Sequence, residues 1–192
     1  MLDIAKWLAT TEWSIALHES LYLYPWIESS HVLFICFFFG TLLFVDLRLT
    51  GKVFTNLSIS EMNKGILPLT IIGFCLMTLT GLLLFYAIPV RNYQNIFFRI
   101  KILLIIIAGL NALFFHRRMS KEAKKWDKDS SIPKSMKVSA IASLFTWSLV
   151  IISGRLIAYN WFDCDRQPQS EWINFLTSCV VDYQLYEGID GI

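Results

Sequence analysis

The sequence predicts an all-α integral membrane protein in which four transmembrane helices form a bundle. The first observation behind this prediction is composition: 55% of the 192 residues are hydrophobic, 17% are charged, and the mean hydropathy is +0.53. The second is a set of four apolar stretches, each close to the roughly 20 residues that a helix needs to cross a bilayer. The third is that basic residues gather beside these stretches, so the net charge of +2 does not indicate a nucleic-acid partner.

The bundle domain is predicted over residues 25–160, with the last residues of the fourth span reaching slightly beyond it. No glycine-rich phosphate loop, CxxC pair or nucleophile elbow accompanies the spans, so no common soluble-enzyme motif is present. We expect the four spans at Trp26–Leu47, Gly65–Ile88, Ile96–Phe115 and Val138–Phe162.

Two smaller segments, residues 1–24 and 161–192, flank the bundle. The first mixes aromatic residues such as Trp7 and Trp13 with charges and lacks the basic start and unbroken apolar core of a signal peptide. We expect it to form one or two amphipathic helices that lie in the membrane interface. In the second segment, Ser170 caps a predicted helix with one apolar face that ends at Gly188. This helix is expected to lie as a cap across the outer mouth of the bundle.

Charge asymmetry predicts the orientation. The loop between the third and fourth spans is strongly basic, and the loop between the first and second is also basic. Because short loops rich in Lys and Arg remain in the cytoplasm, we expect a multi-pass protein of the bacterial inner membrane with both termini in the periplasm. The basic residues are Arg48, Lys52, Lys64, Arg117, Arg118, Lys121, Lys124, Lys125, Lys128, Lys134 and Lys137.

Two of the cysteines, Cys164 and Cys179, fall in the C-terminal segment that the orientation places outside. Disulfides form in such oxidising compartments, so we expect these two to be joined. The other two cysteines, Cys36 and Cys75, lie within spans and are expected to remain reduced.

Ionisable residues from three spans are predicted to meet near the outer leaflet. A helix rises about 1.5 Å per residue, which converts a position along a span into a depth. Ionisable side chains are costly in a membrane and usually face the bundle interior or a wet cavity, so residues that share one depth form a candidate site. The candidates are His31, Glu28, Arg99, Lys101 and Arg155, with Thr80 and Gly81 of the second span close to the same level.

The other histidines have weaker claims to this site. His116 ends the third span at the inner face, about 20 Å from the depth of His31, so these two cannot share a metal. His18 lies in the outer interfacial segment and is a weak candidate for a second ligand beside His31. At the inner boundary, Asp46 and Arg48 are expected to pair with each other.

Three ligands could use a histidine beside several cations. Haem b is coordinated by neutral imidazole, while basic side chains neutralise its propionates. A quinone headgroup could use His31 as a hydrogen-bond or proton partner. Copper would need Cys36, Cys75, Met77 and His31, which are scattered in depth. A purely structural role, with cations reaching the headgroups and His31 bonded to Glu28 or to a neighbouring helix, stands beside these.

The stretches ESLYLYPWIESSHVLF, VDLRLTG, FFRIKILLIIIAGLNALFFHRR and SGRLIAY resemble an uncharacterised family of bacterial four-span membrane proteins, over Glu19 to about Tyr159. More distantly, His31 in the first span and Lys101 in the third resemble the CopD copper-resistance proteins and the HemJ-type protoporphyrinogen oxidases. The HemJ resemblance implies a four-helix haem-binding fold, with His31 as the haem ligand and Lys101 as its companion. HemJ-type proteins carry Pro-Arg where this chain has Asp46-Leu47-Arg48, which favours the haem scaffold over porphyrinogen oxidation.

The leading functional hypothesis is a haem b-binding electron-transfer protein, with a quinone as a candidate redox partner. His31 is the expected axial ligand to the haem iron, and Lys101, Arg155 and Arg99 are the expected propionate anchors. The alternatives are a non-catalytic membrane subunit or assembly factor of a larger complex, and a copper-handling protein. A membrane or periplasmic redox partner and an oligomer are both compatible with the sequence.

Overall fold

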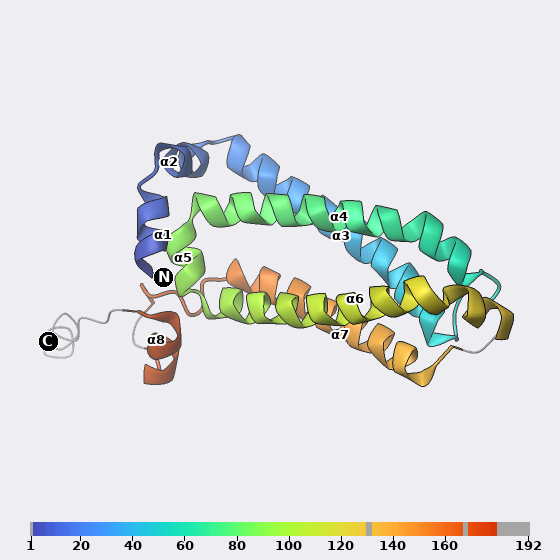
Figure 1. The fold of residues 1–192 in the computed structure, drawn as a ribbon. Helices are drawn as coiled ribbons and strands as arrows, with labels where there is room; N and C mark the ends of the chain where they lie inside the picture. Colours follow the sequence, from blue (N-terminus) through green and yellow to red (C-terminus); the bar gives the residue numbers. More distant parts are fainter. Residues whose placement is uncertain (1, 130–131, 167–168, 180–192) are drawn as a thin grey trace, which may run out of the picture.

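Four long helices run the length of the protein in a computed structural model that describes residues 2–129, 132–166 and 169–179 (Figure 1). They are α3 (Leu23–Thr50), α4 (Ile59–Ala87), α6 (Ile96–Asp129) and α7 (Lys134–Ile157). Each contains a stretch long and apolar enough to cross a membrane, and no strand occurs among the described residues. The predicted fold class, an all-α membrane protein with four spanning helices, is confirmed.

The helices coincide with the predicted spans and differ from them mainly at their ends. α4 starts earlier than predicted because Ser58 caps it, its hydroxyl accepting a hydrogen bond from the Glu61 amide. α6 continues as a helix beyond its apolar part, Ile96–Arg118. α7 ends at Ile157, earlier than predicted, and the chain then turns through Asn160, which has a φ of 55°.

The long helices form two antiparallel pairs. α3 packs along α4 and α6 packs along α7, while α3 also crosses over to contact α7 (Figure 1). Near the middle of the bundle, the rings of Phe38 and Trp147 meet edge to face with centroids 4.7 Å apart. A buried apolar cluster lies at the end of the bundle where one loop joins α3 to α4 and another joins α6 to α7. It comprises Val45, Leu49, Ile59, Met62, Met136 and Ala140.

Most apolar side chains of the long helices face away from the bundle. Only 6% of the apolar window of α6 is buried, and large residues such as Leu103, Leu110 and Phe145 are exposed. Contiguous apolar surface of this extent is unusual on a protein in water but normal on one surrounded by lipid. The exposed faces therefore place these helices in a bilayer.

Four short helices gather at one end of the bundle, which we call the capped end (Figure 1). They are α1 (Leu2–Ala9), α2 (Glu12–Glu19), α5 (Pro89–Gln94) and α8 (Glu171–Thr177). α2 is fixed to the end of α4, because the Ser14 hydroxyl donates to the Tyr86 carbonyl at 2.7 Å. Trp13 is 79% exposed on α2, as expected for a helix in the membrane interface.

Asp163 joins the C-terminal segment to the start of α6. Its carboxylate accepts hydrogen bonds from Asn95 Nδ2 at 2.8 Å and from Arg91 Nε at 2.9 Å. The Asn95 side-chain oxygen in turn accepts from the amides of Phe97 and Phe98 and so caps α6. One buried carboxylate therefore connects α5, α6 and the segment after α7.

A disulfide between Cys164 and Cys179, the pair expected from the sequence, fastens α8 beside this connection, with the two Cα atoms 5.4 Å apart. The prediction of a helix that continues to Gly188 is wrong at its C-terminal end. α8 stops at Thr177 because Ser178 takes a left-handed conformation with a φ of 59°. Residues 180–192 lie outside the described part of the chain.

Candidate functional site

The His31 side chain of α3 is held by α4, at the level that the sequence predicted. Its Nδ1 lies 2.9 Å from the Thr80 hydroxyl oxygen. That hydroxyl has one proton, and it lies 2.9 Å from the Leu76 carbonyl and 3.0 Å from the Met77 carbonyl, to which it donates. A Thr80 hydroxyl that donates to one of these carbonyls can accept from His31, and this arrangement favours the tautomer in which Nδ1 carries the ring proton and Nε2 a lone pair.

A glycine allows α4 to approach this ring. A Cβ atom on Gly81 would lie 3.1 Å from His31 Cε1, closer than an ordinary van der Waals contact. The imidazole plane is thus fixed by the Thr80 hydrogen bond on one atom and by the backbone of Gly81 on another. A ring held in one tautomer and orientation is the usual arrangement for a histidine that binds a metal through its other nitrogen.

Lys101 of α6 brings a positive charge into the same region. Its ammonium group interacts electrostatically with His31, and it lies against Gly154 of α7, where a Cβ would be 3.3 Å from Nζ. Lys101 is partly buried and makes no hydrogen bond or ion pair with any residue that the structure describes. The four long helices therefore supply, in order, a histidine, a threonine–glycine pair, a lysine and a glycine.

The two predicted arginines make other contacts. Arg155 is exposed, and its guanidinium lies 5.2 Å from the centre of the Tyr159 ring. Arg99 donates to the Tyr93 carbonyl at 3.0 Å and to the Ser178 hydroxyl at 3.4 Å, beside the disulfide. Arg155 thus faces away from the bundle and Arg99 belongs to the capped end, so their role as propionate anchors stays a prediction.

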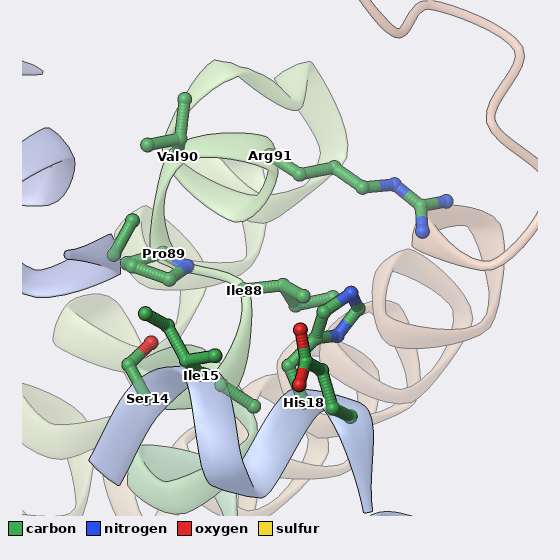
Figure 2. A pocket seen from close by; sticks show the side chains of 10 residues that line it. Ser14, Ile15, His18, Ile88, Pro89, Val90 and Arg91 are labelled. Atoms are coloured by element: carbon green, nitrogen blue, oxygen red, sulfur yellow. The ribbon is translucent and has the colours of Figure 1, made fainter. Parts of the chain in front are cut away.

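His18 lies in a different place, a shallow pocket of about 280 Å³ between α2 and α5. Figure 2 shows His18 beside Ile88, with Arg91 directed across the opening. The His18 ring also contacts the edge of Tyr24, and His31 is not among the residues that line the pocket. His18 as a second ligand stays a prediction that this placement does not favour.

The remaining candidates are spread out. His116 is exposed near the opposite end of α6, and Cys36 and Cys75 are free and exposed on α3 and α4. Within the described ranges, no three His, Cys, Asp or Glu side chains gather as a metal cluster would require.

The predicted pairing of Asp46 with Arg48 is wrong. Arg48 Nε donates to the Leu57 carbonyl at 2.7 Å, whereas Asp46 is buried inside the bundle. Residues two apart on a helix point in different directions. The spacing of Asp46 and Arg48 in the sequence therefore already argued against this pair.

The residues present fit a haem in two respects. Haem b requires an axial nitrogen, which His31 Nε2 can supply, and cations for its propionates, of which Lys101 is one. Gly81 and Gly154 provide small residues where the helices approach these side chains. The haem would supply one-electron chemistry, and the chain would supply the ligand, its orientation and the charge.

The fold and this site define an α-helical multi-pass membrane protein with a polar cluster between its spans. Residues 20–160 match the family described as "Family of unknown function (DUF6644)", and the chain belongs to that family. This agrees with the expected membership of an uncharacterised family, while the distant resemblance to CopD and HemJ-type proteins stays an expectation. No match was found among curated proteins or among solved structures.

Proposed function

We propose that this chain is a haem b-binding electron-transfer protein in which His31 Nε2 is the axial ligand. The observation that carries the proposal is the hydrogen bond that joins His31 Nδ1 to Thr80 at 2.9 Å, because it engages one ring nitrogen and leaves Nε2 as the nitrogen for a ligand. Ligating histidines commonly donate their other N–H in this way, because it fixes the tautomer and raises the basicity of the ligand.

Lys101 is the proposed companion of the haem propionates. A lysine between membrane helices is costly unless an anion is nearby, and no carboxylate of the described residues pairs with it. An anionic group on the ligand would provide the missing partner. Arg155 already contacts the Tyr159 ring, and Arg99 already donates to a carbonyl and a hydroxyl at the capped end. We therefore assign the main role in propionate binding to Lys101.

A quinone is the second candidate ligand at the same residues. An imidazole and an ammonium group next to each other can hydrogen-bond the carbonyl oxygens of a quinone, and the histidine can exchange a proton with it. The position between lipid-facing helices suits a hydrophobic substrate that dissolves in the bilayer. A protein that binds both ligands would transfer electrons between the haem and the quinone.

The capped end is proposed to face the periplasm of a bacterial inner membrane. The opposite end carries the basic residues Arg48, Lys52, Arg117, Lys134 and Lys137, which retain such loops in the cytoplasm. The disulfide then lies on the oxidising side. In this orientation His31 and Lys101 lie in the outer half of the membrane, within reach of a periplasmic redox partner.

The test is the haem content of purified variants, measured as pyridine haemochrome after expression in haem-replete cells. His31→Ala should lose the haem and Lys101→Ala should retain less of it. His116→Ala is the matched control, because it removes an exposed histidine on α6 and should retain the wild-type content. Full haem in His31→Ala would remove His31 as the ligand. A wild-type protein that lacks haem but purifies with a protein partner would instead favour the non-catalytic subunit or assembly factor.

A further inference from the structure

We propose that Asp46 is a proton-binding site within the membrane, held as a neutral carboxylic acid at neutral pH. Asp46 lies on α3 in the half of the bundle opposite the capped end, next to Val45 of the buried cluster near the loops. This site is distinct from His31 and Lys101, and the inference does not depend on the proposed haem. Its ligand is the proton itself.

Asp46 is almost fully enclosed by the bundle. The residue is 3% exposed, and its neighbours in sequence on the same face, Val45 and Leu49, are 2% and 0% exposed. Leu49 and Val45 pack with Met136 and Ala140 of α7. A carboxyl group at this position is therefore separated from water by apolar side chains on several helices.

The described surroundings supply little that could stabilise a negative charge. The Ser143 hydroxyl is the one described side-chain group that acts on the carboxyl group, while Oδ2 is buried without a hydrogen-bond partner. No described Lys, Arg or His forms an ion pair with it. The nearest base in sequence, Arg48, donates to the Leu57 carbonyl instead.

The charged groups on the helices packed around α3 are also directed elsewhere. On α7, Lys137 lies against Gly51 beyond the end of α3, with Nζ 3.3 Å from where a Cβ on Gly51 would be. On α4, Glu61 is exposed, and on α6, His116 is exposed. Arg118 of α6 donates to the Ser135 hydroxyl, and no described Lys, Arg or His of these three helices forms an ion pair with Asp46.

A buried ionised carboxylate with one hydroxyl partner and no cation is strongly disfavoured in a membrane interior. In the neutral acid, the hydroxyl can face Ser143 and Oδ2 becomes a carbonyl oxygen. An unpaired carbonyl oxygen is a much smaller penalty than an unpaired charge. A metal cation would need several more oxygen ligands than Ser143 provides, so the chemistry favours a proton.

Infrared spectroscopy of the full-length protein in membranes tests this directly. The C=O stretching band of a protonated carboxylic acid should be present in the wild type at neutral pH and absent from Asp46→Asn, an isosteric change. Ser143→Ala should shift the band without removing it, because it removes the hydroxyl that interacts with the carboxyl group. Glu28→Gln, which replaces an exposed carboxyl group on the same helix, should leave the band unchanged.

Two results would overturn the inference. One is a wild-type spectrum at neutral pH without a protonated-carboxyl band, which would mean that Asp46 is ionised. The other is a band that persists unchanged in Asp46→Asn, which would assign the proton to another group. The Ser143→Ala spectrum gives an independent answer if Asp46→Asn does not fold, since a band that fails to shift would place the acid away from Ser143.

Discussion

Replacing Thr80 with valine removes the hydroxyl that accepts the His31 ring proton while keeping the shape of the side chain. Without this acceptor, the ring can turn or move its proton to Nε2, the nitrogen proposed to bind iron. Haem binding must then restore the ligating tautomer and orientation. We therefore expect Thr80→Val to bind haem more weakly than the wild type, with the haem still attached to His31.

The size of the effect follows from the hydrogen bond itself. The bond is 2.9 Å long, and Thr80 is 8% exposed, so water cannot readily replace the lost acceptor. A hydrogen bond of this kind contributes about 0.5–1.5 kcal/mol. Because the Met77 carbonyl also interacts with the ring and remains in the variant, we expect a loss of about 1 kcal/mol, or roughly a fivefold weaker affinity.

The assay is a haem titration of apoprotein in detergent, followed in the Soret region. Thr80→Ser keeps the hydroxyl and should bind as the wild type does. Thr70→Val is the matched control, because Thr70 is also buried on α4 and its hydroxyl also donates to the carbonyl four residues earlier, Ile66, at 3.1 Å. Equal affinity of Thr80→Val and wild type would refute the proposed role of the tautomer.

Three further predictions concern the capped end and the orientation. Asp163→Ala should lower the free energy of unfolding by about 1–3 kcal/mol, since the buried Asn95 amide loses its acceptor. Thermal unfolding in detergent measures this change. The control is Asp165→Ala, which alters an exposed residue and should change the stability little. Reducing the Cys164–Cys179 disulfide, which closes a loop with a sequence separation of 15, should destabilise the cap by about 3 kcal/mol in the chain-entropy model, and unchanged proteolysis of the C-terminal segment after reduction would contradict this. A cysteine placed at Lys124 in a cysteine-free protein should react with an impermeant reagent only after the cells are opened, and labelling in intact cells would reverse the orientation.

The level of the polar site could be predicted because helical rise converts a position in a span into a depth. His31 lies at the depth of Thr80 and Gly81, and the structure brings these three residues into contact. The rotation of each helix about its axis could not be predicted in the same way. The spans are apolar on most sides, so no polar face indicates which side chains point inward.

The arginines show the consequence of this missing information. Arg155 follows Gly154 directly, and one residue along a helix is a turn of about 100°, so the side chain faces away when Gly154 faces Lys101. Arg99 and Lys101 are two positions apart, and they likewise point to different surroundings. Depth alone grouped one histidine with three cations, and helix rotation separated two of the cations, Arg99 and Arg155, from the other two residues.

The end of α8 shows a different limit. Ser170 and the apolar spacing predicted where the helix begins, but Ser178 carries no sequence signal for its left-handed conformation. Cys179 directly follows Ser178, so its disulfide with Cys164 lies next to this end of the helix. Local pattern therefore predicted the start of α8, whereas tertiary contacts determine its end.

The most direct measurement of the central claim is the reduced-minus-oxidised optical spectrum of the wild-type protein purified from haem-replete cells. A haem coordinated by His31 predicts a Soret band and the visible bands of haem b, in proportion to the protein, and their loss in His31→Ala. A wild-type protein that is pure, folded and free of these bands would contradict the account.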